Sequence, residues 1–157
     1  MRELSVCHCA ACAPRLGDVA ELRADVIGRM LADIRYRVGG RADVLLMATD
    51  GWQHTGADVG VDLASVAPSV EGFILKATAA DGGPDVAAMK SAASRVLDRT
   101  RLVANVNAMP PQQDLVGHAT AMVAAGAAEL RYYHAGLVGP ERLRSIGVAV
   151  REVAGHG

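Results

Sequence analysis

Aromatic side chains, lysine and long apolar runs are all scarce in this chain of 157 residues. Aromatic residues make up 3% of the sequence, and lysine occurs at only two positions. No apolar run reaches the roughly 18 residues of a membrane-spanning helix, and the first residues lack the apolar stretch of a secretory signal peptide. We therefore expect a cytoplasmic protein with no membrane partner.

An excess of charge of either sign is also missing. The 16 Lys and Arg and the 17 Asp and Glu give a formal net charge of −1, and the two signs are mixed along the chain. A nucleic-acid-binding surface would require clustered Lys and Arg, so the sequence predicts no nucleic-acid partner. Hydrophobic residues make up 51% of the chain, which is enough for a single folded domain over residues 1–157.

Cysteine is confined to one short window of the segment 1–17. Cys7, Cys9 and Cys12 lie there, with His8 between the first two. In a reducing compartment such clustering favours metal or redox chemistry over disulfides. Three thiolates and one imidazole make the four ligands of a structural zinc site, so all four residues are candidate zinc ligands. A remote His or Asp is an alternative fourth ligand, and reduced thiols in a loop are the alternative to a metal site.

A strand followed by a helix recurs four times along the sequence. Short apolar runs predict buried strands at 43–49, 70–77, 101–108 and 128–134. The first run is continuously apolar, which is typical of a parallel strand covered on both faces. We predict an α/β fold in which residues 43–157 form a parallel (βα)4 half-barrel, equivalent to half of an eight-stranded TIM barrel.

Along the sequence, a helix is predicted before and after each strand. An apolar period near 3.6 residues predicts an N-terminal helix over 18–38, capped by Asp18 and ended by Gly39. Four more helices are predicted at 63–67, 84–98, 114–126 and 141–153. The first and last strands are too apolar to remain exposed edges, so we expect a homodimer or a partner subunit that completes the barrel.

Polar and aromatic residues gather at the carboxyl ends of the predicted strands. Parallel α/β proteins place their chemistry at these ends. The candidate catalytic residues are Asp50, Lys76 and His134. The candidate residues for binding a small-molecule ligand are Trp52, His54, Asn105, Asn107 and Tyr133.

Lys76 has two interpretations. It follows Leu75 and precedes Ala77, so its side chain could be buried among apolar groups. Burial would lower the pKa of the amine and make it nucleophilic, as in aldolases that form a Schiff base. Alternatively, the side chain extends to solvent or pairs with Asp50.

The acidic and imidazole candidates have structural alternatives as well. Asp50 precedes Gly51 and could be a turn residue. The imidazoles of His54 and His134 titrate near neutral pH and suit proton transfer, although either could be a polar loop residue.

The remaining candidates concern the walls of a binding site. Trp52 and Tyr133 could stack on a flat ligand such as a sugar, or they could pack into the core. Asn105 and Asn107 are two positions apart, so both face the same side of one strand.

A resemblance is carried by the segment Leu4-Ser5-Val6-Cys7-His8-Cys9-Ala10-Ala11-Cys12. It is similar to the Leu-Ser-x-Cys-x-Cys-x-x-Cys motif of alanine-rich bacterial proteins related to glycoside-hydrolase-like TIM barrels. Asp62-Leu63-Ala64 and Tyr132-Tyr133-His134-Ala135-Gly136 also resemble these proteins. The resemblance implies that this chain corresponds to the second half of their barrel, a helix followed by four βα units.

These observations lead to three functional hypotheses. The first is a TIM-barrel-like enzyme or enzyme subunit acting on a small polar, carbohydrate-like molecule, glycoside-hydrolase-like in its chemistry. The second is a non-catalytic assembly component that docks through its sheet edges and its cysteine motif. The third is a Schiff-base lyase or aldolase that uses Lys76.

Overall fold

The computed structural model of the protein describes residues 9–48, 61–96, 98–109 and 114–155. The strands are β1 (Leu45–Ala48), β2 (Gly72–Lys76), β3 (Arg101–Asn107) and β4 (Glu129–Tyr133). The α-helices are α1 (Leu16–Val38), α2 (Leu63–Val66), α3 (Val86–Ala93), α4 (Leu115–Ala124) and α5 (Pro140–Ala154). Short 3-10 helices are η1 (Ala13–Arg15), η2 (Ala67–Ser69) and η3 (Ala135–Leu137).

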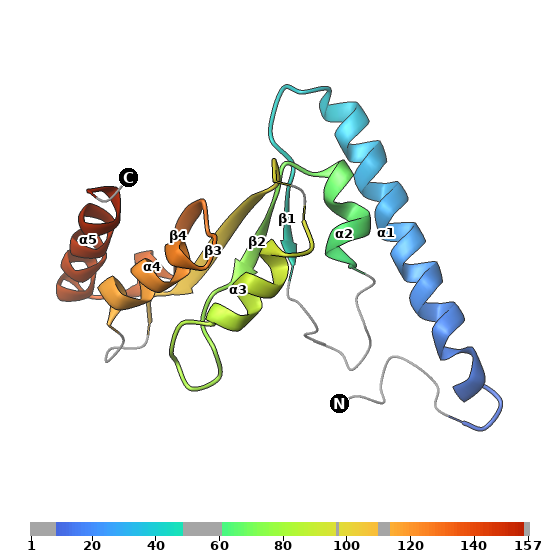
Figure 1. Cartoon of the computed structure of the whole chain (residues 1–157), viewed down its shortest axis with the longest axis horizontal. Helices are drawn as coiled ribbons and strands as arrows, with labels where there is room; N and C mark the ends of the chain where they lie inside the picture. Colours follow the sequence, from blue (N-terminus) through green and yellow to red (C-terminus); the bar gives the residue numbers. More distant parts are fainter. Residues whose placement is uncertain (1–8, 49–60, 97, 110–113, 156–157) are drawn as a thin grey trace.

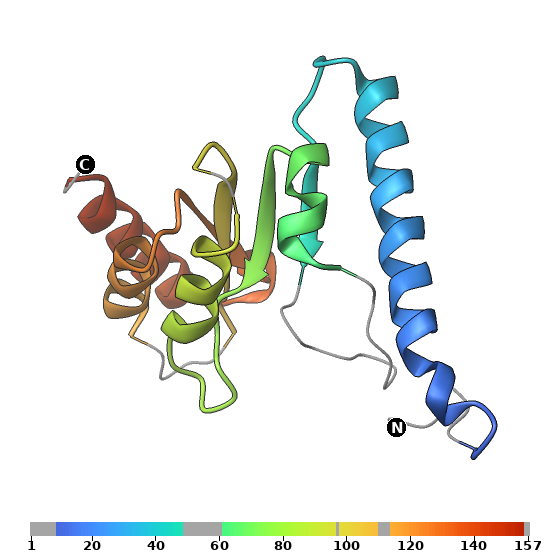
Figure 2. The same ribbon diagram turned by 45° about the vertical axis from the view of Figure 1, so that its right-hand side comes forward.

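The four strands form one parallel sheet in the order β1-β2-β3-β4. Figures 1 and 2 both show the sheet between α1, which lies beyond β1, and α5, which lies beyond β4. This confirms the predicted α/β fold with four parallel strands, each slightly shorter than the apolar run that predicted it.

The unbroken strand order determines where the helices lie. Crossovers between parallel strands are right-handed almost without exception, so a strand order that never reverses places the connecting helices on the same face of the sheet. All five α-helices contribute side chains to one core, which packs on that face. The strand residues of this helix-covered face are Leu46, Ala48, Phe73, Leu75, Leu102, Ala104, Val106, Leu130 and Tyr132.

The opposite face of the sheet, which we call the open face, carries the other half of each strand. None of its side chains belongs to the core cluster on the helix-covered face, although Val103 of β3 is fully buried. The prediction that the first strand is covered on both faces is therefore wrong for this part of the chain, and Met47 of β1 is 63% exposed. The open-face residues are Leu45, Met47, Gly72, Ile74, Lys76, Arg101, Val103, Asn105, Asn107, Glu129, Arg131 and Tyr133.

Aspartate side chains begin three of the helices. Asp62 accepts a hydrogen bond from the backbone N–H of Ser65 (3.0 Å), and Asp85 accepts one from Ala88 (3.1 Å). Asp114 accepts from two backbone N–H groups at the start of α4. Such caps satisfy backbone donors that have no partner within the helix. Asp18 does not cap α1 as predicted, because the helix begins at Leu16 and Asp18 lies inside its first turn.

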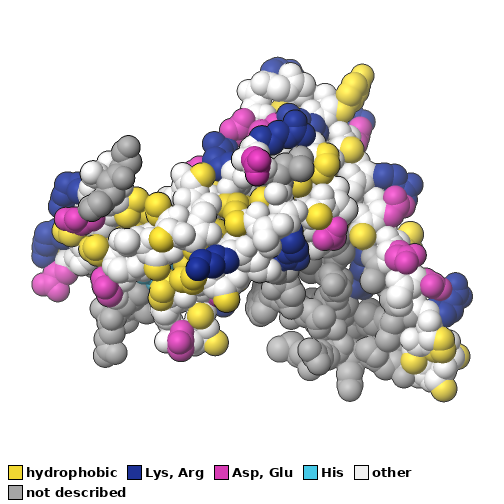
Figure 3. Space-filling model, in the orientation of Figure 1, with side chains coloured by type: hydrophobic (Ala, Val, Ile, Leu, Met, Phe, Trp, Pro, Cys, Tyr) yellow, Lys and Arg dark blue, Asp and Glu magenta, His cyan; other side chains and the backbone are white. Residues whose placement is uncertain are grey.

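The apolar surface of helix α1 is wider than the part of it that packs against the core. Leu31 is 3% exposed and belongs to the core, and Ile27 packs against it. A second row at intervals of four residues remains exposed, and we call it the α1 stripe: Leu22, Val26, Met30 and Ile34. Figure 3 shows acidic and basic side chains interspersed along this helix. Neither α1 nor any other helix in the described ranges combines the length and the apolar character needed to cross a bilayer.

Candidate functional site

The register of the sheet brings polar side chains of three strands together at the carboxyl ends of the open face. Lys76 of β2 is the register partner of Asn105 of β3, which in turn pairs with Arg131 of β4. We call these three residues the Lys76 row. One step further along the strands, Asn107 pairs with Tyr133 to form the Tyr133 row. Residues in register on a parallel sheet point to the same face, about 4.8 Å apart from strand to strand.

Lys76 lies on the open face and is exposed to solvent. Its side chain has neither a hydrogen bond nor an ion pair with any other described residue. Its apolar sequence neighbours Leu75 and Ala77 point the other way, into the core. Because side chains alternate along a strand, Lys76 is not buried among apolar groups, which was one of its two interpretations.

The two asparagines are half-buried and face the same side, as predicted. The Oδ1 atom of Asn107 accepts a hydrogen bond from the backbone N–H of Met109 (3.1 Å). This contact fixes the orientation of the amide, so its Nδ2 donors remain available to a ligand. The backbone N–H of Asn107 donates to the buried Thr78 hydroxyl (3.4 Å), which links the ends of β2 and β3.

A series of ion pairs begins at the amino ends of the open face and extends to Arg131 of the Lys76 row. Arg101 donates through Nη2 to Asp43 (2.8 Å) and lies 3.7 Å from Glu129. Glu129 in turn accepts a hydrogen bond of 2.6 Å from Nε of Arg131. Two acids and two bases neutralise each other here. Lys76, at the carboxyl end of β2, is the cation of this face that takes no part in these ion pairs.

The carboxyl end of β4 carries two adjacent rings. Tyr133 is 51% exposed, and its ring centroid lies 3.6 Å from that of His134. His134 follows the strand in the left-handed backbone region with φ 64°, which is unusual for a residue with a Cβ. Tyr132 points to the opposite face, where burial raises the pKa of its hydroxyl. Of the two tyrosines, Tyr133 is therefore the one available to a ligand on the open face.

Part of the predicted site lies outside the described residues. Asp50, Trp52 and His54 belong to the segment 49–60, and Cys7 and His8 to the segment 1–8. The described part of the site consists of five residues at the carboxyl ends of the neighbouring strands β2, β3 and β4: Lys76, Asn105, Asn107, Tyr133 and His134.

Cys9 and Cys12 are the described members of the cysteine window. They lie in the turn that precedes η1, where the backbone N–H of Cys12 donates to the carbonyl of Cys9 (3.0 Å). Within the described residues, no group of three or more His, Cys, Asp or Glu side chains is arranged to hold a metal ion. The zinc site stays a prediction, because two of its four ligands are outside this part of the chain.

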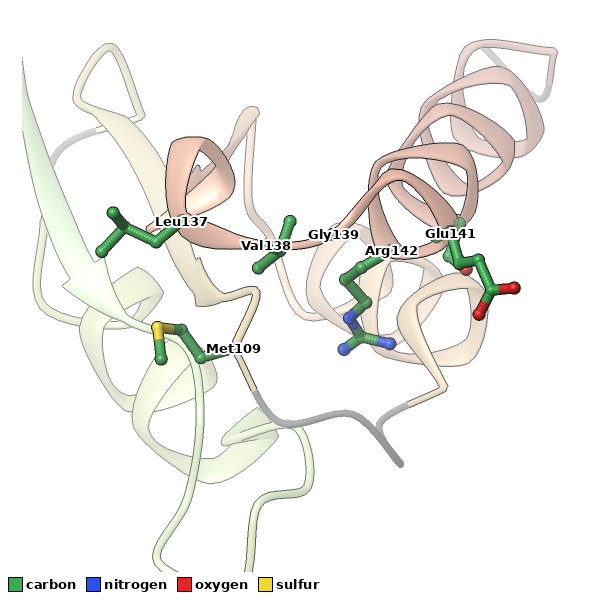
Figure 4. A pocket seen from close by; sticks show the side chains of 7 residues that line it. Met109, Leu137, Val138, Gly139, Glu141 and Arg142 are labelled. Atoms are coloured by element: carbon green, nitrogen blue, oxygen red, sulfur yellow. The ribbon is translucent and has the colours of Figure 1, made fainter.

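A pocket of about 390 Å³ opens beside the same end of the sheet. Met109 follows β3, whereas Leu137, Val138 and Gly139 follow β4, and Arg142 belongs to the first turn of α5. Figure 4 shows Arg142 pointing into this space and Glu141 pointing away from it. Nε of Arg142 donates to the carbonyl of Ala108 (2.9 Å), and partial burial lowers the pKa of its guanidinium.

A buried histidine that the sequence analysis missed supports this end of the sheet. His118 of α4 is 2% exposed, and its Nε2 lies 2.8 Å from the carbonyl oxygen of Ala77, one residue after Lys76. Burial lowers the pKa of the imidazole, while the bond to Ala77 and the charge of Asp114 raise it by less. A neutral imidazole that donates its Nε2 proton satisfies this geometry. His118 shares its helix face with Leu115, Ala119 and Met122. A histidine at an apolar position of a helix was therefore the sequence signal for its burial.

Comparisons with protein-family models, with curated proteins and with solved structures found no significant match for this chain. The chemistry of the site is therefore argued from its own residues.

Proposed function

We propose that this chain is one half of a TIM-barrel-like enzyme whose substrate is a small polar molecule, such as a carbohydrate. The observation that carries the proposal is the Lys76 row and the Tyr133 row, in register at the carboxyl ends of a one-faced parallel sheet. In barrels of this kind the open face is the interior, and substrates bind at the carboxyl ends of the strands. The resemblance of the cysteine segment to glycoside-hydrolase-like barrels agrees with this assignment.

The division of chemistry follows from the residue types. The two rows supply one ammonium, one guanidinium, two amides and one phenol, all of which donate hydrogen bonds. Glycoside hydrolysis needs two carboxyl groups that flank one bond. In this proposal the two rows bind and orient the substrate. The acid and base come from outside them, from the segment 49–60, which contains Asp50, or from the other half of the barrel.

A binding experiment tests this proposal without requiring turnover. Saturation-transfer NMR with a panel of monosaccharides should show contact with the unchanged protein. The Asn107→Leu variant removes amide donors from the Tyr133 row and should lose the signal. Met47→Leu, on the same face but two rows nearer the amino ends than Asn107, is the matched control and should retain it. Equal signals from all three proteins, or none from the unchanged protein, would contradict the proposal.

A second candidate, a non-catalytic assembly component, is favoured by the α1 stripe together with the outer edges of β1 and β4. The described residues place no further strand beside either edge. An exposed row of apolar side chains commonly marks an interaction surface. This candidate and the enzyme half predict the same partner-binding edges, and they differ in whether a small ligand binds at the two rows.

The lyase hypothesis receives less support from the position of Lys76. A nucleophilic lysine requires a lowered pKa, which burial or a second nearby cation would provide. Lys76 is exposed, and Arg131 in the same row is paired with Glu129. Borohydride reduction with small carbonyl compounds would trap an adduct on Lys76 if the lyase hypothesis holds.

The helices favour a partner subunit over a second copy as the missing half. A closed eight-stranded barrel has one helix over each seam between neighbouring strands. Here α2, α3 and α4 connect the four strands, while α1 and α5 lie beyond the two edges. Two copies would bring α5 of one and α1 of the other to the same seam. A partner with four strands and three connecting helices would leave each seam with one helix.

A further inference from the structure

The polar groups of the open face differ in charge and in hydrogen-bonding capacity between the amino and carboxyl ends of the strands. Asp43, Arg101, Glu129 and Arg131 pair among themselves, so their charges cancel locally. Lys76, in the same row as Arg131, forms no ion pair with any described residue. The row next to it ends in amide and phenol groups, and no carboxylate belongs to either row.

The amides of Asn105 and Asn107 add hydrogen-bond donors to the ammonium of Lys76 on the open face. Asn105 lies between Lys76 and Arg131 in the register, and its side chain makes no hydrogen bond to another described residue. Asn107 has its acceptor oxygen occupied by the Met109 N–H, so Nδ2 is the free end of that amide. A lysine ammonium offers three donors and no acceptor. A ligand group that faces these residues must accept several hydrogen bonds and benefit from positive charge.

We propose that the Lys76 and Tyr133 rows bind the oxyanion of a small polar ligand, either a phosphate monoester or a carboxylate. This inference rests on the proposed function, because it specifies the substrate class of the same site. Lys76 supplies the charge, Asn105 and Asn107 supply amide donors, and the exposed Tyr133 ring covers the apolar part of the ligand. Charge-assisted hydrogen bonds of this kind are shorter and stronger than neutral ones.

The test is an amide NMR titration of the full chain with three probes at constant ionic strength: inorganic phosphate, acetate and glucose. We expect phosphate or acetate to shift the backbone signals of Lys76, Asn105 and Asn107 with a dissociation constant on the order of 1 mM. A response to phosphate alone identifies a phosphate ligand, and a response to acetate alone identifies a carboxylate. A response to both supports the shared oxyanion chemistry.

The two lysines of the chain provide a matched pair of variants. Lys76→Gln keeps an amide donor but removes the charge, and should weaken oxyanion binding roughly fivefold or more. Lys90→Gln removes the other lysine, which is exposed near the end of α3, and should leave binding unchanged. Asn105→Asp places a negative charge inside the row and should also weaken binding.

The outcomes separate this inference from the proposed function. An unchanged dissociation constant in Lys76→Gln would overturn the oxyanion assignment. If glucose alone shifts these signals, the ligand is neutral, so the inference fails and the proposed function stands. If none of the three probes shifts them, both are overturned.

Discussion

The imidazole of His118 connects the helix layer to the strand end that carries Lys76. It is buried among Leu115, Ala119 and Met122 and donates to the carbonyl of Ala77. A charged imidazole would lose solvation in this place, so the folded protein favours the neutral form and the pKa is lowered from 6.5. Asp114, the cap of the same helix, is the charged group that partly opposes this shift.

The burial of His118 predicts that stability depends on pH. Below pH 6.5 the unfolded chain binds a proton that the folded protein does not. The contribution of His118 to the free energy of unfolding should therefore be fully present well above that pH and decrease as the pH falls, by at most about 1.4 kcal/mol per pH unit. Urea unfolding between about pH 7.5 and 5 measures this slope.

Two variants assign the slope to its source. His118→Gln keeps a donor for Ala77 but cannot titrate, so the slope in this pH range should decrease. His134→Gln changes a half-buried histidine at the end of β4 and should retain it. The same slope in His118→Gln as in the unchanged protein would show that another group is responsible.

The site could be predicted from sequence only where strand ends identify it. Lys76, Asn105, Asn107 and Tyr133 were found because each stands at the end of an apolar run, and the parallel register then places them on one face. His118 was missed because a histidine inside a helix has the same sequence pattern whether it is buried or exposed. The burial proposed for Lys76 depended on its sequence neighbours, which the strand directs to the other face.

Helix α1 differs from the other elements in how its apolar surface is used. Its buried row, which contains Ile27 and Leu31, packs against the core, whereas the α1 stripe remains exposed. Its C-terminus ends at Gly39 with φ 58°, a backbone conformation that glycine adopts without strain. Arg35 near that end forms an ion pair with Glu71, which also accepts from the backbone N–H of Val44 (2.6 Å). These contacts hold the end of α1 beside the start of β1.

A matched pair of leucines tests which row of α1 stabilises the chain. Leu31→Ala empties a core position and should lower the free energy of unfolding by about 2–4 kcal/mol. Leu22→Ala makes the same change at a position that is 59% exposed, and should cost less than about 1 kcal/mol. Chemical denaturation of the isolated chain measures both values. A comparable loss for Leu22→Ala would mean that the α1 stripe is already covered in solution.

The elements were easier to predict than their environment. Apolar runs and aspartate caps fixed the strands and the starts of α2, α3 and α4, because burial and capping act locally. Whether one or both faces of a strand are covered depends on what packs there. The run Leu45-Leu46-Met47-Ala48 is apolar throughout, although its even-numbered residues face the helices and its odd-numbered residues lie on the open face.

At the scale of the whole molecule, no described strand pairs with the outer edge of β1 or of β4. Glu71 donates its N–H to the carbonyl of Val44, so the backbone groups of Val44 point toward β2. Successive residues of a strand direct their N–H and C=O groups to alternate sides. The backbone groups of Leu46 therefore point toward β2, and those of Met47 point outward. In the same way, Ala108 donates to Tyr133, which leaves the backbone groups of Leu130 directed away from β3. A partner strand at either edge would pair with these outward groups.

Amide hydrogen exchange of the monomeric chain tests this claim most directly, with the mass confirmed by light scattering on the same sample. We expect the N–H groups of Met47 and Leu130 to exchange at nearly the rate of an unprotected peptide. The amides of β3, which are paired on both sides, should exchange far more slowly. Protection of Met47 and Leu130 equal to that of β3 would mean that both edges are already paired, and would contradict the half-barrel.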